Sequence, residues 1–359
     1  MAKVDVEPEP LEEALTDPAI PAEIIGRSPG QLFWRRFRKD RGAFLGIIIV
    51  GIIVLLAVLA PLFEKWVGHP YDKIYASEMT TDSPPGCSSD PNFPVTQLCV
   101  QGIPAGPTLD APVYNAEGQQ KGIFLFGAAD GTGRDLFVRS LYGARTSLYV
   151  GLAATLIEIL LGVSFGIIAG FFRGKTDTFI SRTCDVFFAL PTLLLMLGIS
   201  AACGAQPPGQ ECLGGLLKPG TSLIIVLIGF FSWPYLARII RGQVLSIREK
   251  EYIEAARSLG ASNWRIMFRD VLPNVLAPII VYATLLIPTN ILAEASLSFL
   301  GLGVPPGTPS WGAQISDSTN IMRIAPWTVL FPGAFLFLTT LAFNLVGDGL
   351  RDAFDPKTA

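Results

Sequence analysis

The chain has 359 residues, of which 50% are hydrophobic and only 16% are charged. Its mean hydropathy of +0.46 is higher than an ordinary soluble domain shows. The formal net charge of −3 argues against nucleic-acid binding, because domains that bind nucleic acids usually carry a basic face. The composition therefore predicts a membrane protein.

Six apolar segments approach the roughly 20 residues that a helix needs to cross a bilayer. They are predicted at about residues 43–63, 147–172, 179–202, 221–240, 275–300 and 327–345. Pro191, Pro234, Pro278 and Pro288 fall inside three of them. We expect these segments to remain single spans, because neighbouring helices can satisfy the carbonyls that a proline leaves free. The predicted fold class is all-α, with six transmembrane helices.

The distribution of Lys and Arg predicts the orientation, because these residues are enriched in cytoplasmic loops. They are dense before the first segment, between the second and third, and between the fourth and fifth. The loops after the third and fifth segments contain only Lys218 and Arg323, respectively. We therefore expect both termini in the cytoplasm.

Within this topology the chain divides into five parts. Residues 1–30 are predicted to be a disordered cytoplasmic tail and not a cleavable signal peptide, because they are acidic and rich in proline. Residues 31–63 would hold a basic interfacial helix that faces anionic lipid, followed by the first span; the same cations also suit an ordinary positive-inside anchor. Residues 64–146 are predicted as an extracytoplasmic loop rich in turns, residues 147–350 as the core with five spans, and residues 351–359 as a cytoplasmic C-terminus.

Four cysteines fall in the predicted extracytoplasmic loops. Cys87 and Cys99 lie in the first loop, and Cys203 and Cys212 lie between the third and fourth segments. An even set on the oxidising face predicts two local disulfides, Cys87–Cys99 and Cys203–Cys212, with four free thiols as the alternative. The chain has one His, and its cysteines have no zinc-like spacing, so no metal site is predicted.

The cytoplasmic loop at residues 246–273 is the most informative stretch. Residues 248–259 are rich in strong helix formers, and Gly260 follows where a helix C-terminus requires a positive φ. Ser262 is a natural N-cap for a second short helix, and Pro273 is expected to end that helix. The pattern predicts a helix–Gly–helix hairpin that projects into the cytosol.

The first helix of this hairpin has the residues of a docking surface. Ala255 and Ala256 leave a face small enough to enter a groove on another protein, and Glu254 and Arg257 supply charge at its rim. Glu254-Ala255-Ala256 followed after three residues by Gly260 resembles the EAA loop of ABC importer permeases. The resemblance implies that this loop is the coupling helix that docks on the ATPase subunit.

Three further stretches are similar to the C-type permeases of dipeptide and oligopeptide ABC importers. They comprise residues 133–135 with residues 143–148, residues 294–303 with the Pro-Ser-Trp-Gly at 309–312, and residues 343–352. The resemblance implies a subunit of the bacterial inner membrane that forms half of a peptide translocation pathway. It also implies a homologous B-type permease, two ATPase subunits that bind ATP and Mg²⁺, and an extracytoplasmic binding protein. Closely similar permeases carry nickel, glutathione or sugar-linked peptides, which are the alternative cargoes.

Two motifs suggest enzyme chemistry but fit it poorly. Residues 170–176 resemble a phosphate-binding loop but have three residues, not four, between the glycines. Gly162, Ser164 and Gly166 match a nucleophile elbow, which would make the chain an intramembrane hydrolase. The only His is predicted just outside the first span, far from Ser164, so a general base is missing. The spacing of Gly162, Gly166 and Gly170 favours close helix packing instead.

Ionisable residues inside membrane segments are costly and are therefore candidates for function. Glu158 and Glu294 are predicted as candidate pathway-lining groups. Asp185 is interpreted as a polar contact between helices or with a second permease subunit.

Overall fold

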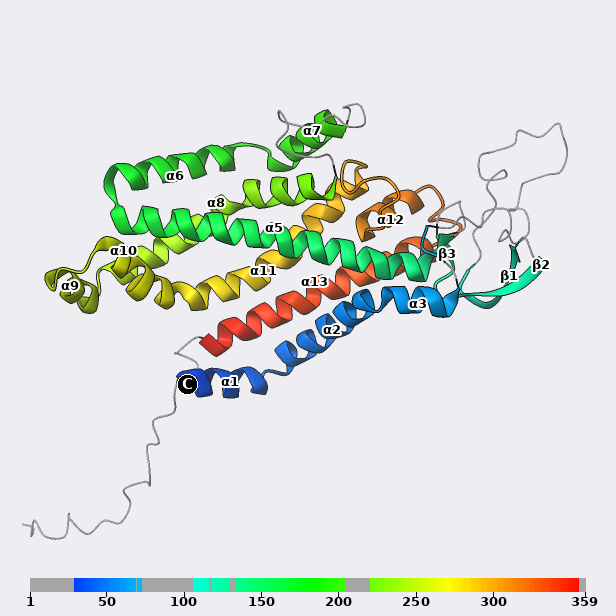
Figure 1. The fold of residues 1–359 in the computed structure, drawn as a ribbon, viewed down its shortest axis with the longest axis horizontal. Helices are drawn as coiled ribbons and strands as arrows, with labels where there is room; N and C mark the ends of the chain where they lie inside the picture. Colours follow the sequence, from blue (N-terminus) through cyan, green and yellow to red (C-terminus); the bar gives the residue numbers. More distant parts are fainter. Residues whose placement is uncertain are drawn as a thin grey trace, which may run out of the picture.

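The computed structural model describes residues 29–68, 70–72, 106–115, 118–129, 134–204 and 220–354. Its long helices lie side by side in one bundle (Figure 1). The predicted tail lies almost wholly outside the described residues, as do Cys87, Cys99 and Cys212 and the last five residues.

The described elements are mostly helices. They are α1 (Pro29–Lys39), α2 (Arg41–Val58), α3 (Ala60–Val67), β1 (Thr108–Asn115), β2 (Gly118–Phe124), β3 (Ala128–Ala129), β4 (Arg134–Asp135), α5 (Leu136–Phe172), α6 (Gly174–Ala189), α7 (Thr192–Gly204), α8 (Thr221–Arg248), α9 (Glu251–Ser258), α10 (Asn263–Ile266), the π-helical turn η2 (Met267–Val271), α11 (Leu272–Phe299), α12 (Trp311–Ser318) and α13 (Trp327–Phe354).

Five stretches of this part of the chain are long and apolar enough to cross a membrane as continuous helices. They are α2, α5, α8, α13 and the run from α10 to α11. The third predicted segment is different, because α6 and α7 meet at an angle of 78° and make a sixth span only if counted together. The predicted segment at residues 179–202 is therefore not one continuous helix, because the chain bends at Pro191. Leu190 before it is extended, with φ −85° and ψ 136°, as a residue before proline prefers.

The second span begins earlier than predicted. Helix α5 starts at Leu136, where Asp135 caps it by accepting a hydrogen bond from the Val138 amide at 3.0 Å. Eleven residues assigned to the extracytoplasmic loop therefore belong to this helix. The described part of that loop also contains an antiparallel hairpin, β1–β2, where only turns were expected.

Helices α5 and α8 share the most extensive contact in the bundle, which runs along glycines. A Cβ placed on Gly162 would lie 2.8 Å from the Leu236 Cβ, and one on Gly170 would lie 2.8 Å from the Val244 Cβ. The four-residue spacing of these glycines thus marks close helix packing, as predicted. No larger residue fits there unless the helices separate.

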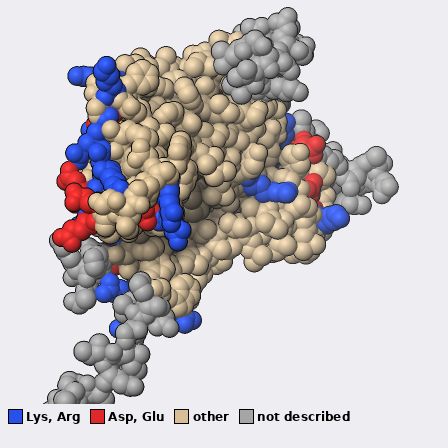
Figure 2. Space-filling view, turned by 60° about the vertical axis from the view of Figure 1, so that its left-hand side comes forward, with Lys and Arg blue, Asp and Glu red and all other residues tan. Residues whose placement is uncertain are grey.

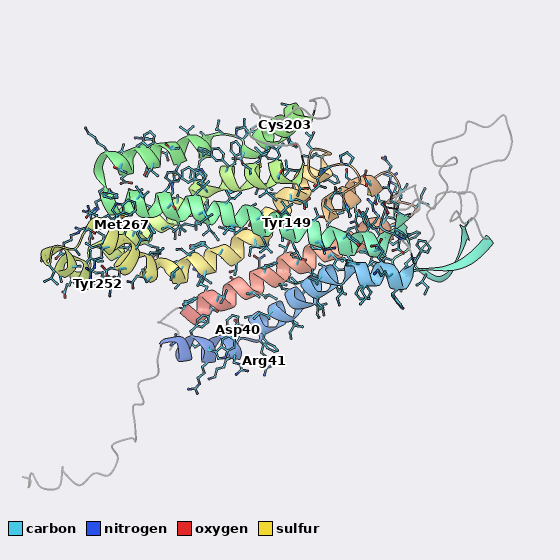
Figure 3. The ribbon with its side chains drawn as sticks, viewed as in Figure 1. Asp40, Arg41, Tyr149, Cys203, Tyr252 and Met267 are labelled. Carbon is cyan, nitrogen blue, oxygen red and sulfur yellow. The ribbon has the colours of Figure 1, made fainter. Side chains whose placement is uncertain are left out.

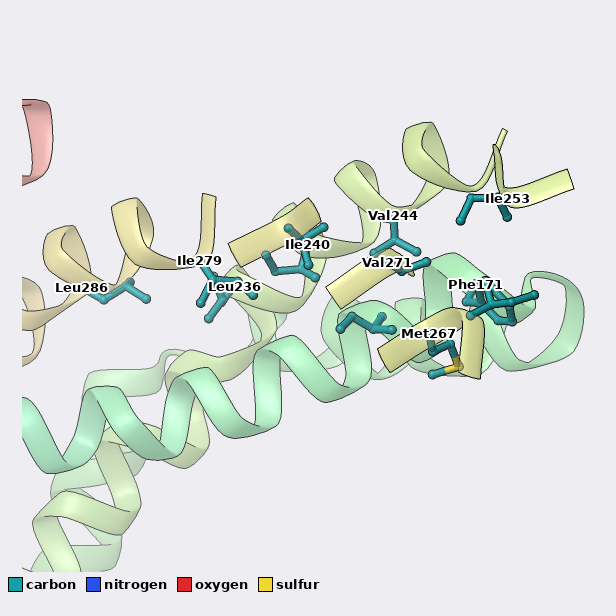
Figure 4. Packing of buried hydrophobic residues seen from close by; sticks show 12 residues of the cluster. Phe171, Leu236, Ile240, Val244, Ile253, Met267, Val271, Ile279 and Leu286 are labelled. Atoms are coloured by element: carbon teal, nitrogen blue, oxygen red, sulfur yellow. The ribbon is translucent and has the colours of Figure 1, made fainter. Parts of the chain in front are cut away.

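A large apolar cluster fixes the end of the bundle near α9 (Figure 4). It joins side chains from α5, α8, α9, α10, η2 and α11. Its fully buried members are Leu236, Ile240, Val244, Ile253, Ile266, Val271 and Val275. This packing holds the short helices α9 and α10 against the ends of three long ones.

Charged side chains gather toward the ends of the bundle, and the face between them is largely uncharged (Figure 2). Such a band is what a lipid bilayer requires of the protein that crosses it. Helix α1 is separated from α2 at Asp40, whose carboxylate caps α2 by accepting hydrogen bonds from the Gly42 and Ala43 amides (Figure 3). Phe33 of α1 packs on Phe354 of α13 with ring centroids 4.5 Å apart, so the first and last described helices meet.

Candidate coupling hairpin and transport cavity

The hairpin predicted at residues 246–273 is present, with changed boundaries. Helix α8 continues to Arg248, and α9 begins only at Glu251 after an extended Lys250 with ψ 144°. Gly260 has φ +78°, which is the conformation expected for it. Ser262 caps α10 by accepting a hydrogen bond from the Arg265 amide at 3.3 Å. The chain thus turns twice within a few residues and returns to the bundle.

Pro273 does not end the second helix as predicted. Helix α10 continues through the π-helical turn η2 directly into α11, and Pro273 sits in the first turn of α11. The proline cannot donate to a carbonyl of the preceding turn, and the wider π-helical turn before it accommodates its ring without breaking the helix. The hairpin is therefore joined to α11 by unbroken helical backbone.

The two sides of α9 differ. Ile253 is fully buried, and Ala256 packs partly against the same cluster. Glu254 and Ala255 are exposed on the other side, and Arg257 is exposed although its guanidinium folds back over the Phe171 ring. The expectation that both alanines form one outward face is corrected, because only Ala255 faces away from the bundle.

Large apolar side chains that were not predicted as part of a docking surface are exposed on the same hairpin. Leu259 is 89% exposed, Trp264 and Phe268 are each 61% exposed, and Tyr252 is 46% exposed. Trp264 and Phe268 stack with ring centroids 5.7 Å apart. Figure 3 shows Tyr252 on α9, at the tip of the bundle. Apolar residues in an otherwise charged loop were the signal that could have revealed this surface.

The hairpin is also tied to the turn between α5 and α6. The Arg173 guanidinium pairs with the Glu249 carboxylate, and the Arg248 guanidinium donates a hydrogen bond to the Phe171 carbonyl. The Arg257 guanidinium lies over the Phe171 ring, 5.4 Å from its centroid. The stretch that resembles a phosphate-binding loop forms this turn. Its role in the structure is to hold the hairpin.

Glu158 lines a cavity of about 490 Å³ between α5, α6, α7, α8 and α11. The glutamate is fully buried, and its Oε2 accepts a hydrogen bond from the Asn290 amide at 2.9 Å. Its Oε1 has no hydrogen-bond partner within the described residues. A buried carboxylate beside an open cavity is consistent with its predicted place on a pathway.

Glu294 is arranged differently. It is fully buried, its Oε2 accepts a hydrogen bond from Ser147 at 2.8 Å, and its Oε1 accepts one from Ser298 at 2.6 Å. The Ser147 hydroxyl also accepts a hydrogen bond from the backbone amide of Trp311, at the start of α12. Both oxygens of Glu294 therefore have partners: one joins α11 to α5, whose Ser147 also contacts α12, and the other is bound within α11. Its geometry is that of a structural group.

Asp185 and Asp177 make the polar contacts between helices that the sequence suggested for Asp185. Arg238 of α8 donates to the Asp185 carboxylate at 2.7 Å, and Arg241 donates to both oxygens of Asp177 at 2.5 and 2.7 Å. These pairs join α6 to α8.

The hydrolase alternative gains no support from the surroundings of Ser164. The serine lines a cavity of about 260 Å³ whose other walls are apolar side chains, among them Trp264 and Met267. None of these residues can act as a general base. In the described ranges no three His, Cys, Asp or Glu side chains come together as metal ligands.

Cys203 is disulfide-bonded in the structure, and Cys184 is a buried free thiol. The partner of Cys203 lies outside the described residues, so the pairings Cys203–Cys212 and Cys87–Cys99 stay predictions.

The bundle, its hairpin and its buried polar contacts define a multi-pass membrane subunit of the permease class. Residues 162–359 match the family described as binding-protein-dependent transport system inner membrane component. Residues 28–85 match the N-terminal TM domain of oligopeptide transport permease C. The chain belongs to the binding-protein-dependent transport family of inner membrane components, with the N-terminal domain of its oligopeptide permease C branch.

Full-length relatives agree with this assignment. The chain is 36% identical to the oligopeptide transport system permease protein OppC of Bacillus subtilis, over 90% of this chain and 88% of that protein. It is 35% identical to the glutathione transport system permease protein GsiD of Pectobacterium atrosepticum, over 92% of each chain. It is 36% identical to the dipeptide transport system permease protein DppC of Alkalihalophilus pseudofirmus, over 92% of this chain and 90% of that protein. A chain of the MetNI methionine ABC transporter is 19% identical, with a TM-score of 0.48 over 61% of this chain and 97% of that chain.

Proposed function

We propose that this chain forms half of the translocation pathway of an ATP-driven peptide importer in the bacterial inner membrane. The names of the Bacillus and Alkalihalophilus relatives support a peptide cargo. A homologous B-type permease would form the other half of the pathway. Two cytoplasmic ATPase subunits would bind ATP and Mg²⁺, and an extracytoplasmic binding protein would deliver the peptide. This chain itself would need no cofactor.

The observation that carries the proposal is the outward face of the α9–α10 hairpin. Leu259 is 89% exposed at the tip, and Ala255 beside it leaves the helix surface small. Exposed apolar side chains next to charged ones are typical of the centre of a protein interface. The side chain of Ile253 and the Arg173–Glu249 pair hold the hairpin rigidly against the bundle. A hairpin that is packed on the bundle and has an exposed apolar tip can bind an ATPase and transmit its movement to α8 and α11.

Replacing Leu259 by Asp tests this role. Because its side chain makes little contact with the rest of the chain, we expect Leu259→Asp to insert, fold and pair with the partner permease normally. A charge at the centre of a docking surface should cost about 2 kcal/mol or more of binding free energy. The purified complex in vesicles should therefore lose at least roughly ten-fold of its peptide uptake and of its substrate-stimulated ATP hydrolysis.

Leu259→Met is the matched control, since it keeps an apolar side chain of similar size and should retain both activities. Ala255→Arg provides a second change on the same face and should behave like Leu259→Asp. Normal stimulation in Leu259→Asp and Ala255→Arg would remove the hairpin from the mechanism. The same vesicles distinguish the cargoes, because uptake of glutathione, whose first peptide bond is γ-linked, or of nickel in preference to the α-linked tripeptide trialanine would overturn the assignment to ordinary peptides.

The second candidate cargo is glutathione, a small peptide-like solute. It is favoured by the relatives named as glutathione permeases, which are as similar to this chain as those named for peptides.

A further inference from the structure

The cavity beside Glu158 has an unusual lining for the interior of an apolar bundle. It holds one carboxylate, Glu158, and one amide, Asn290, among hydroxyls and aromatic rings. The aromatic members are Phe187, Phe188, Phe231, Tyr235 and Tyr282. At about 490 Å³ the cavity is within the usual size range of small-molecule sites.

Only one of the two carboxylate oxygens of Glu158 accepts a hydrogen bond, which leaves the other available to a donor from a bound solute. One carboxylate oxygen accepts the Asn290 amide at 2.9 Å, and Asn290 also donates to the Thr155 hydroxyl at 2.9 Å. The other oxygen, Oε1, is buried without a hydrogen-bond partner in the described part of the chain. Such an oxygen is costly to bury, and a charged N–H donor that enters the cavity would relieve that cost.

The cavity opens to the outside of the bundle. Three of its lining residues, Phe188, Leu190 and Tyr235, are 48%, 39% and 52% exposed. These exposed residues come from α6, from the bend between α6 and α7, and from α8. The cavity therefore opens at the side of this subunit and is lined by the fully buried Glu158, and a second subunit would be needed to close the site.

We propose that this cavity receives the α-ammonium group of a peptide in transit, with Glu158 as its counter-ion. This inference rests on the proposed transport function. Aromatic rings around a carboxylate suit an organic cation, because the cation is attracted both to the faces of the rings and to the negative charge. A bare metal ion such as Mg²⁺ or Ca²⁺ prefers several carboxylate or carbonyl oxygens, and the lining offers one carboxylate and one amide. An ammonium group also fits one free carboxylate oxygen, whereas a guanidinium favours two.

The chemistry explains how one site could serve many cargoes. Every linear peptide with a free N-terminus carries an α-ammonium group at neutral pH, whatever its side chains are. Binding through that group and a flexible aromatic wall would select peptides as a class without selecting a sequence.

The test compares two tripeptides that differ only in this charge. Radiolabelled trialanine and N-acetyl-trialanine are equilibrated with the whole transporter complex in lipid nanodiscs, without binding protein and without ATP. We expect the wild-type complex to bind trialanine roughly ten-fold more tightly than its acetylated form, because a hydrogen bond to a charged group is lost on acetylation. Glu158→Gln should abolish this preference.

Thr289→Lys is the second variant. Thr289 lines the same cavity and is exposed, so a lysine there should be tolerated and would place a tethered ammonium near Glu158. It should abolish the preference without altering Glu158, which keeps the test valid if Glu158→Gln fails to assemble. Asp185→Asn is the matched control. It removes one acidic group of α6 outside the cavity and should keep the preference.

The preference persisting in Glu158→Gln or in Thr289→Lys would overturn the proposal, as would equal binding of the two tripeptides by the wild type. Uptake of trialanine into vesicles by the wild-type complex is measured in parallel. Uptake without a Glu158-dependent preference would refute this inference alone, whereas absence of any peptide uptake would refute the proposed function itself.

Discussion

A buried carboxylate joins three helices near the α12 end of the bundle. Glu294 accepts hydrogen bonds from Ser147 of α5 and Ser298 of its own helix α11. The Trp311 indole donates to the Ser140 carbonyl at 3.1 Å and thereby fixes α12 against the start of α5. These residues include members of two stretches that resemble C-type permeases, so the resemblance has a physical basis in this network.

Removing this carboxylate should weaken the fold. Glu294→Leu leaves the hydroxyls of Ser147 and Ser298 buried without that acceptor, at a cost of roughly 2–4 kcal/mol. Glu294→Gln keeps one acceptor oxygen and should lose less. The midpoint of thermal unfolding of the purified complex measures both variants. Equal midpoints for Glu294→Leu and the wild type would show that the network does not stabilise the bundle.

The sequence identifies Glu158 and Glu294 as unusual but does not separate their roles. Both lie in apolar segments, and the hydrogen-bond partner that distinguishes each one comes from a helix more than 100 residues away. Ser147 reaches Glu294 across 147 positions, and Asn290 reaches Glu158 across 132. Contacts of that range depend on how the helices pack, which local spacing does not encode.

At the scale of elements, α5 and α8 pack closely because glycines, which have no side chain, stand where the two helices meet. A Cβ on Gly166 would lie 2.7 Å from the Ala237 carbonyl oxygen and 2.8 Å from the Ile240 Cβ. On the other helix, a Cβ on Gly229 would lie 2.7 Å from the Ile157 Cβ. The backbone of each helix therefore touches side chains of the other at these glycines. Such van der Waals contacts between helices replace contacts with lipid and stabilise the pair.

A larger side chain at a glycine between α5 and α8 should push these two helices apart. Gly166→Val adds three carbons where none fits, and overpacking of this kind costs roughly 1–3 kcal/mol. Gly242→Ala is the matched control on α8, because no atom lies within 4 Å of its added Cβ. We expect lower yield and a lower unfolding midpoint for Gly166→Val and neither change for Gly242→Ala. Similar behaviour of the two variants would contradict the packing argument.

Proline shows where element prediction from sequence succeeds and where it fails. Pro234 and Pro288 are buried and lie within continuous helices, because the packing around them keeps the backbone helical. Pro191 is exposed, so nothing opposes the extended conformation that proline imposes on Leu190. Segment composition predicts the spans well, since 20 apolar residues have few alternatives. Whether a given proline bends its span depends on neighbours that only the fold supplies.

At the scale of the whole molecule, the bundle has two distinct ends. Helix α1, the end of α13 and the α9–α10 hairpin lie toward one end, and α3, α12 and the β1–β2 hairpin lie toward the other (Figure 1). The contact between Phe33 and Phe354 places the start and the end of the described chain together. An even number of crossings produces this arrangement, so the bent α6–α7 pair has to count as one span.

This arrangement predicts which parts of the chain face the cytoplasm. Arg248, Arg257 and Arg265 lie at or beside the hairpin, and positively charged residues are retained on the cytoplasmic side during insertion. A reporter fused after Ala359 should therefore read as cytoplasmic, whereas one inserted at Asn115, in the β1–β2 hairpin, should read as external. Paired alkaline phosphatase and fluorescent protein fusions measure both positions, since the first is active only outside the cytoplasm and the second only within it. An external signal from the C-terminal fusion would mean that α6 and α7 do not complete a crossing. It would also place the hairpin or the C-terminus on the wrong side for contact with an ATPase, and the proposed coupling would fail with the topology.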